Sequence, residues 1–147
     1  MTSPACPLPQ PGRREESDLI DRLLMARRIA VIGASDNPNR AGNYVPEYLI
    51  EHGYEIIRVN PNHETVFGRR CYPSLDQIPG KVDLVNVFRR PGACADVTRQ
   101  AIAIGAGGVW LQSGITNAEA RQLACDARLD YIEDRCIMVE HRRHRPQ

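Results

Sequence analysis

Short apolar runs alternate along the chain with segments in which apolar residues recur at helical spacing. The runs predict strands buried on both faces of a sheet, over residues 28–33, 55–59, 82–88, 108–112 and 131–133. The helical spacing predicts helices over residues 43–52, 91–104 and 136–141, and another from about residue 117. Strands separated by helices indicate βαβ units with right-handed crossovers. The pattern therefore predicts an α/β fold: a doubly wound, Rossmann-like parallel sheet of about five strands with helices on both faces.

Residue types at the ends of the predicted helices agree with this pattern. Ser17 is the predicted N-cap of a first helix, whose apolar side includes Leu19 and Ile20. Pro91 suits the first turn of a helix, and Thr116 or Asn117 is the predicted cap of another.

The chain is predicted to contain one domain with a tail at each end. Residues 1–16 are rich in proline and predict a disordered tail, residues 17–142 form the domain, and residues 143–147 form a basic tail. Within the domain, the segment from residue 60 to 73 contains Gly68 and Pro73 and is predicted to be a loop.

Charge and cysteine content exclude several classes of protein. The formal net charge is +1, from 19 basic and 18 acidic residues, so global charge gives no attraction to nucleic acid or to an anionic membrane. The five scattered cysteines indicate neither a disulfide framework nor a metal site, and they predict reduced thiols. The N-terminal segment lacks a secretory pattern and no apolar run is long enough to span a bilayer. We expect a soluble cytoplasmic protein, with any protein partner left open.

The loop after the first predicted strand is the strongest candidate for a ligand site. In an open parallel sheet, ligands bind outside the carboxyl ends of the strands, where the strand order reverses. Gly33 allows a sharp turn and a close backbone approach, and Ser35, Asn37 and Arg40 bring donors. The following helix adds unpaired N–H groups and the positive end of its dipole. The loop is predicted to bind a phosphate; an ordinary strand-to-helix turn is the alternative.

Two other strand ends narrow the choice of ligand. Arg89 and Arg90 follow the third strand and are either phosphate contacts or solvated surface residues. The second strand ends at Asn60, where NAD-binding domains usually carry an acidic residue that holds the ribose. The first loop also lacks the G-x-G-x-x-G fingerprint, so NAD is disfavoured.

No catalytic constellation is recognisable in the sequence. Ser113 is not part of a G-x-S-x-G elbow and has no evident histidine partner. Cys136 follows Arg135 and starts a predicted helix, which are features that lower a thiol pKa, although most such cysteines are simply packed. No residue is assigned a catalytic role.

Several motifs in fixed order resemble one known family. They are 29–35 (Ile-Ala-Val-Ile-Gly-Ala-Ser), 53–54 (Gly-Tyr), 59–61 (Val-Asn-Pro), 87–91 (Val-Phe-Arg-Arg-Pro), 109–115 (Val-Trp-Leu-Gln-Ser-Gly-Ile) and 134–136 (Asp-Arg-Cys). From about residue 28 to 142, the chain resembles the small bacterial CoA-binding proteins. Their Rossmann-like domain is similar to the CoA-binding part of the succinyl-CoA synthetase alpha subunit.

The resemblance implies that coenzyme A lies in the crevice at the strand ends. It assigns ligand contacts to the loops after the first, second and third strands. Asn37, a donor noted above, and Gln112, at the end of the fourth strand, are added to them. The candidate set is Gly33, Ala34, Ser35, Asn37, Arg40, Asn60, Pro61, Phe88, Arg89, Arg90 and Gln112. The leading hypothesis is a non-catalytic carrier, sensor or regulatory module for CoA or acyl-CoA. The alternatives are a partner-dependent subunit of an acyl-CoA-handling enzyme and, third, an NAD(P)-binding redox sensor.

Overall fold

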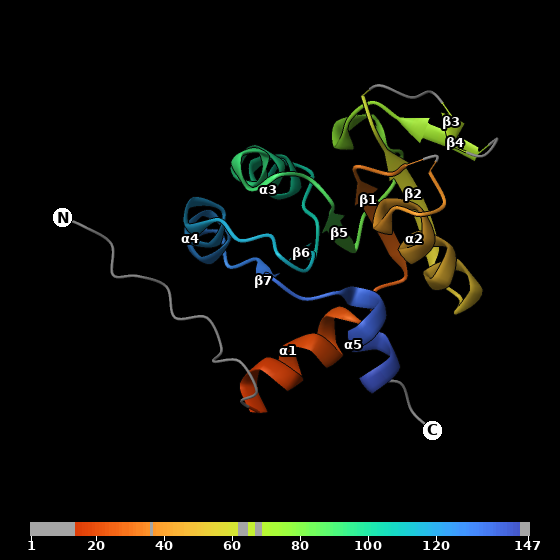
Figure 1. Cartoon of the computed structure of the whole chain (residues 1–147). Coiled ribbons are helices and arrows are strands. Elements are labelled where there is room, and N and C mark those ends of the chain that lie inside the picture. Colours follow the sequence, from red (N-terminus) through yellow and green to blue (C-terminus); the bar gives the residue numbers. More distant parts are fainter. Residues whose placement is uncertain (1–13, 36, 62–64, 67–68, 145–147) are drawn as a thin grey trace.

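The structure is a computed structural model that describes residues 14–35, 37–61, 65–66 and 69–144. Helices and strands alternate over most of this range (Figure 1). In chain order they are α1 (Arg14–Leu23), β1 (Arg28–Ile32), α2 (Ala41–Glu51), β2 (Glu55–Val59), β3 (Thr65–Val66), β4 (Arg69–Tyr72), β5 (Leu84–Val87), α3 (Cys94–Ala103), β6 (Gly108–Leu111), α4 (Ala118–Asp126), β7 (Asp130–Ile132) and α5 (Ile137–His144). A 3₁₀ turn, Pro91–Ala93, leads into α3.

The strands form one sheet with the order β3-β4-β2-β1-β5-β6-β7. All neighbouring pairs are parallel except β3 with β4, which is antiparallel at the edge. The predicted doubly wound fold is therefore confirmed, but the sheet has seven strands. The predicted loop between residues 60 and 73 contains the two extra strands.

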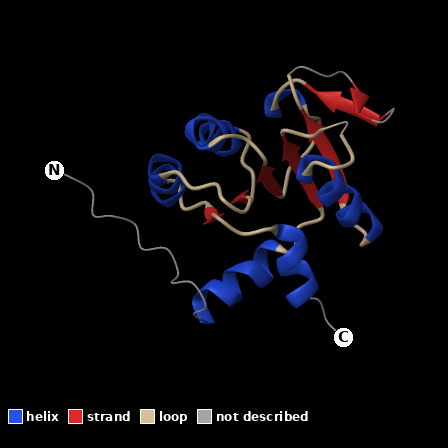
Figure 2. Ribbon diagram, in the orientation of Figure 1, coloured by secondary structure: helices blue, strands red, loops and turns tan. Residues whose placement is uncertain are grey.

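Helices cover both faces of the sheet, as Figure 2 shows. Alternate residues of β1 point to opposite faces, because side chains alternate along a strand. Ala30 and Ile32 belong to the core cluster that includes α3 and α4, whereas Ile29 and Val31 belong to the cluster with α1, α2 and α5. Trp110 is fully buried.

Both terminal helices differ from the prediction. The first helix begins at Arg14, so Ser17 lies inside it and does not cap it. The extra turn is held by a tertiary contact, because Arg135 donates to the Glu16 carboxylate at 3.1 Å. The last helix continues to His144, whose ring lies 2.6 Å from the Asp21 carboxylate, so residues 143 and 144 belong to the helix instead of the predicted tail.

Elsewhere, one predicted cap is present as expected. The Asn117 side chain accepts a hydrogen bond from the Ala120 N–H at 2.8 Å and starts α4. Residues 1–13 and 145–147 lie outside the described residues, and with them most of the predicted tails.

Candidate functional site

The strand order reverses between β1 and β5. The chain passes from β1 to β2 on one side and later returns to β5 on the other side of β1. The carboxyl ends of β1 and β5 are joined directly, because the Phe88 N–H donates to the Ile32 carbonyl at 2.9 Å. This switch point places the loop after β1 beside the loop after β5. Ligands of doubly wound sheets bind at such a switch point.

Gly33 is the residue at which the two loops meet. Its φ of +88° is a backbone conformation that favours glycine. A Cβ at Gly33 would lie 2.8 Å from the Phe88 carbonyl oxygen, which is too close for any side chain. The approach of the Phe88 backbone therefore requires glycine at position 33, and the predicted approach of Gly33 to a ligand stays a prediction.

The loop after β1 is held by its own hydrogen bonds. The Ser35 hydroxyl accepts from the Asn37 N–H at 3.1 Å, and the Asn37 side chain accepts from the Asn39 N–H at 2.9 Å. The Arg40 N–H donates to the Asn37 carbonyl at 3.0 Å, and α2 begins at the next residue. These turns fix the backbone while the Ser35 hydroxyl proton remains available to donate to a ligand.

Three arginines near the switch point carry no counter-charge. Within the part of the chain that the structure describes, the side chains of Arg40, Arg89 and Arg90 make no hydrogen bond or ion pair. Arg40 and Arg90 are exposed, and Arg89 is partly exposed. Guanidinium groups pair bidentately with phosphates, so these three offer anchors for a ligand with several phosphates.

Asn60 lies on the β2 side of the switch point. Its side-chain amide donates to the Ala34 carbonyl at 2.8 Å, so it contacts the first loop directly. The neighbouring Pro61 is exposed. Sequence reasoning missed Asn43 of α2, whose buried side chain donates to the Ser35 carbonyl at 2.8 Å. The signal available was an asparagine in the first turn of a helix, where its intrinsic propensity is poor.

Gln112 follows β6 at the same edge, but its side chain is occupied within the fold. It is only 4% exposed. Its Oε1 accepts from the Asn86 amide and from the Ile137 N–H that starts α5, both at 3.0 Å. The Asn86 Oδ1 is buried and has no partner among the described residues. Gln112 therefore ties β5, β6 and α5 together beneath the strand ends, and its predicted ligand contact stays a prediction.

The described cysteines differ in oxidation state. Cys71, Cys94 and Cys136 carry thiols that form no disulfide, whereas Cys125 is disulfide-bonded, so the expectation of reduced thiols is wrong for Cys125. Burial raises the pKa of the Cys94 thiol, which keeps it protonated and weakly nucleophilic. No group of three or more His, Cys, Asp or Glu side chains suited to a metal ion occurs among the described residues.

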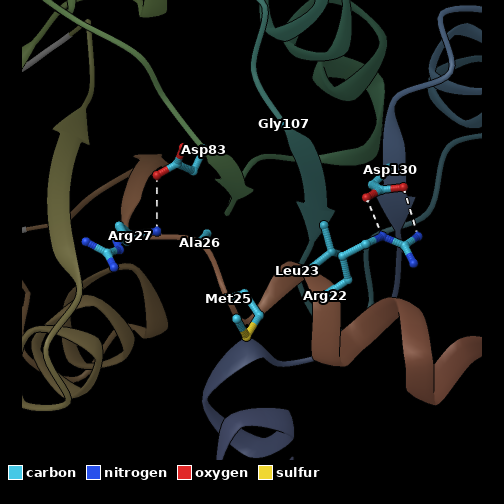
Figure 3. Close-up of a pocket in the computed structure, with 8 residues that line it drawn as sticks. All are labelled: Arg22, Leu23, Met25, Ala26, Arg27, Asp83, Gly107 and Asp130. Carbon is cyan, nitrogen blue, oxygen red and sulfur yellow. Dashed lines mark hydrogen bonds and ion pairs between the residues drawn. The ribbon is translucent and has the colours of Figure 1, made fainter.

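An open pocket lies at the opposite edge of the sheet, near the amino ends of the strands (Figure 3). Its carboxylates are already used by the fold. Asp130 pairs with Arg22 at 2.9 and 3.0 Å, and Asp83 accepts from the N–H groups of Arg27 and Arg28. The lining residues are Arg22, Leu23, Met25, Ala26, Arg27, Asp83, Gly107 and Asp130. The two carboxylates of the pocket are therefore occupied by contacts that hold α1 and the start of β1 in the fold.

None of the helices in the described ranges is both long enough and apolar enough to cross a membrane.

Comparisons with known proteins identify the family of the chain. A family model described as a CoA binding domain matches residues 27–142. The chain therefore belongs to the CoA-binding domain family, and the resemblance seen in its sequence is confirmed.

Individual relatives fall into two groups. An uncharacterized protein from Bacillus subtilis (strain 168), YneT, is 37% identical over 131 residues, which cover 89% of this chain and 95% of that protein. A solved structure of a hypothetical protein from Pyrococcus horikoshii OT3 matches with a TM-score of 0.84 and 41% identity, over 94% of this chain and 98% of that one. Subunit alpha of the ADP-forming acetate–CoA ligase II from Pyrococcus furiosus is 42% identical over 67 residues, or 45% of this chain and only 15% of that subunit.

Proposed function

We propose that this protein binds coenzyme A or an acyl-CoA at the carboxyl edge of its sheet and acts as a non-catalytic carrier, sensor or regulatory module. The observation that carries the proposal is the meeting of the Gly33 loop with the Phe88–Arg90 loop at the switch point. That meeting brings a tight backbone turn and unpaired arginines to one crevice in a chain of the CoA-binding domain family.

The charge of the ligand suits the side chains in this crevice. Coenzyme A carries a pyrophosphate and a ribose phosphate, so it needs several cationic or N–H donors. Arg40 and Arg89 come from the two loops that flank the switch point, and the dipole at the start of α2 favours an anion there. We assign the phosphates to these donors and leave the pantetheine arm and its thiol free to carry an acyl group.

A second candidate function rests on one specific similarity. Part of the chain is 42% identical to a subunit of an ADP-forming acetate–CoA ligase. A partner-dependent role would give this protein the CoA site and a second chain the catalytic groups. It would be supported if the protein co-purified with a second chain in fixed ratio and turned over an acyl-CoA only in that complex.

Thermal unfolding with different nucleotides tests the choice of ligand. A ligand at 100 times its Kd stabilises a protein by roughly 2.7 kcal/mol. For a chain of this size, the Tm should rise by about 5–10 °C with CoA. NAD should give a smaller rise or none, because Asn60 replaces the acidic residue that would hold its ribose. A larger rise with NAD than with CoA would reject the assignment.

Two further measurements separate a binding module from an enzyme. Native mass spectrometry of the purified protein should show an adduct of the mass of CoA or an acyl-CoA. The pure protein should not hydrolyse or transfer the acyl group of acetyl-CoA or succinyl-CoA, because no nucleophile–base pair was recognised in its sequence. Steady turnover that a single site substitution abolishes would contradict the non-catalytic role.

A further inference from the structure

Two carbonyl groups of the loop after β1 accept hydrogen bonds from side chains, and the carbonyl before them packs against α2. The Gly33 carbonyl oxygen faces Gly42 so closely that a Cβ there would lie 2.6 Å away. The Ala34 carbonyl accepts from the Asn60 side chain at 2.8 Å, and the Ser35 carbonyl accepts from the Asn43 side chain at 2.8 Å. The loop conformation therefore depends on two side-chain amides, one from the end of β2 and one from α2.

Planarity of the peptide group transmits this restraint to the N–H groups. A carbonyl and the N–H that follows it point in opposite directions across a trans peptide. With its carbonyl held by Asn60, the peptide after Ala34 directs the Ser35 N–H to the Gly42 carbonyl at 3.2 Å. With the Gly33 carbonyl facing α2, the Ala34 N–H points away from α2. Fixing the carbonyls thus fixes which backbone donors remain available for an anion.

We propose that Asn43 and Asn60 are positioning residues that hold this loop in the conformation that binds CoA, and that this role at position 60 cannot be filled by the carboxylate that an NAD site needs there. The inference rests on the proposed function. An NAD-binding domain needs a carboxylate at the end of its second strand to accept from the ribose hydroxyls. A carboxylate at position 60 cannot donate to the Ala34 carbonyl and would instead face its oxygen. One side chain at position 60 cannot both donate to the Ala34 carbonyl and offer a carboxylate to the ribose of NAD. The loop geometry and the ligand preference are therefore coupled through Asn60.

The variant Asn60→Asp tests this coupling, with CoA binding measured by isothermal titration between pH 7.5 and 5. At pH 7.5 the introduced carboxylate repels the Ala34 carbonyl, and Kd for CoA should rise about tenfold to a hundredfold. As the pH falls, the introduced carboxyl group takes up a proton and can donate again. The ratio of variant to wild-type Kd should therefore shrink toward 1, which a general loss of structure would not produce.

Asn39→Asp is the matched control. Asn39 lies in the same loop and is exposed, so the change adds the same charge near the phosphates without facing a held carbonyl. Its Kd for CoA should rise clearly less than that of Asn60→Asp, since only the general effect of the added charge remains. Asn43→Asp should behave like Asn60→Asp, and it replaces that variant if Asn60→Asp does not fold.

The outcomes separate this inference from the proposed function. If wild type does not bind CoA, the proposed function fails. If wild type binds CoA and Asn60→Asp binds no more weakly than Asn39→Asp, the positioning role is rejected. A weakened variant whose Kd ratio does not change with pH also rejects it. A gain of NAD binding in Asn60→Asp would show that residue 60 faces the ligand directly and would overturn the coupling.

Discussion

The two edges of the sheet differ in how their arginines are used. At the amino edge, Arg22 pairs with Asp130 and Arg28 pairs with Glu55, whereas the Arg27 side chain has no partner among the described residues. At the carboxyl edge, the side chains of Arg40 and Arg89 have no partner in the described parts of the chain. Exposed ion pairs contribute little to stability, but they occupy the donors that an anionic ligand would need. We propose the carboxyl edge as the binding edge because unpaired arginines from two adjacent loops come together there, although an open pocket lies at the other edge (Figure 3).

Glycines make a similar close contact at each edge, which allows a matched comparison. A Cβ at Gly42 would lie 2.6 Å from the Gly33 carbonyl oxygen in the candidate site. A Cβ at Gly107 would lie 2.6 Å from the Asp83 carbonyl oxygen at the amino edge. The steric demand is the same, and only the edge differs.

The largest effect on binding is expected from Gly42→Ala. The added methyl group displaces the Gly33 carbonyl and therefore shifts all the donors of this loop at once. Each charged contact to CoA that is lost costs about 1.5–3 kcal/mol of binding free energy. The Kd for CoA should therefore rise by about a hundredfold or more. Gly107→Ala should lower the free energy of unfolding by a similar amount, about 1–3 kcal/mol, yet leave CoA affinity unchanged. Isothermal titration and urea unfolding check both variants, and equal losses of affinity would remove the distinction between the edges.

A smaller effect on binding is expected from the arginines themselves. Arg40→Ala and Arg89→Ala should each weaken CoA binding about tenfold to a hundredfold, because a charge-assisted contact to phosphate is lost. Arg27→Ala is the control: Arg27 is exposed at the amino edge and its side chain has no partner in the described residues. Titrations at moderate salt should show wild-type affinity for Arg27→Ala. If Arg40→Ala and Arg89→Ala also bind like wild type, the phosphates lie elsewhere.

The smallest expected effect is on the free energy of unfolding, through the pH-dependent contribution of Asp83 at the amino edge. Hydrogen bonds from the backbone N–H groups of Arg28 and Arg27 lower the pKa of the Asp83 carboxyl from its ordinary value of 3.8. Because its pKa is lowered in the folded state, the Asp83 carboxylate stabilises the protein fully above its ordinary pKa of 3.8. This contribution is lost as the pH falls through the lower pKa of the folded state. Asp83→Asn should cost about 1 kcal/mol at pH 7, after allowance for solvent screening.

The stability difference between wild type and Asp83→Asn should therefore shrink below about pH 3.8. Urea unfolding at pH 7, 4 and 3 measures it. Asp126→Asn, an exposed residue that accepts from Gln122, gives the size of an ordinary surface substitution. A difference that grows with acidity would mean that the Asp83 carboxylate is not stabilised by the fold.

The fold was predictable where buried strands left a continuous apolar run. The five predicted strands correspond to β1, β2, β5, β6 and β7, all in the parallel sheet. Strand β4 (Arg-Arg-Cys-Tyr) was missed because it has no apolar run, and only its register with β2 places it in the sheet. The start of α1 was missed because its extra turn depends on the contact between Glu16 and the distant Arg135.

Within the candidate site, local backbone requirements were predictable and long-range side-chain partners were not. The demand for glycine at position 33 follows from a strand that ends in a sharp turn. The partner of Gln112 is the N–H of Ile137, which is remote in sequence, so nothing near Gln112 indicates that its oxygen is occupied. Asn60 was predicted to contact the ligand, yet its amide holds the Ala34 carbonyl, a contact that appears only when β2 lies beside β1.

The most direct test of the central claim is a titration of the isotope-labelled protein with CoA, followed by two-dimensional NMR of its backbone amides. We expect the largest changes in amide chemical shift at residues 33–35, 40 and 88–90, at the carboxyl edge. Residues 25–28, 83 and 107, around the amino-edge pocket, should change little. The largest changes at that pocket, with the Gly33 and Phe88 loops unaffected, would contradict the placement of the ligand at the switch point.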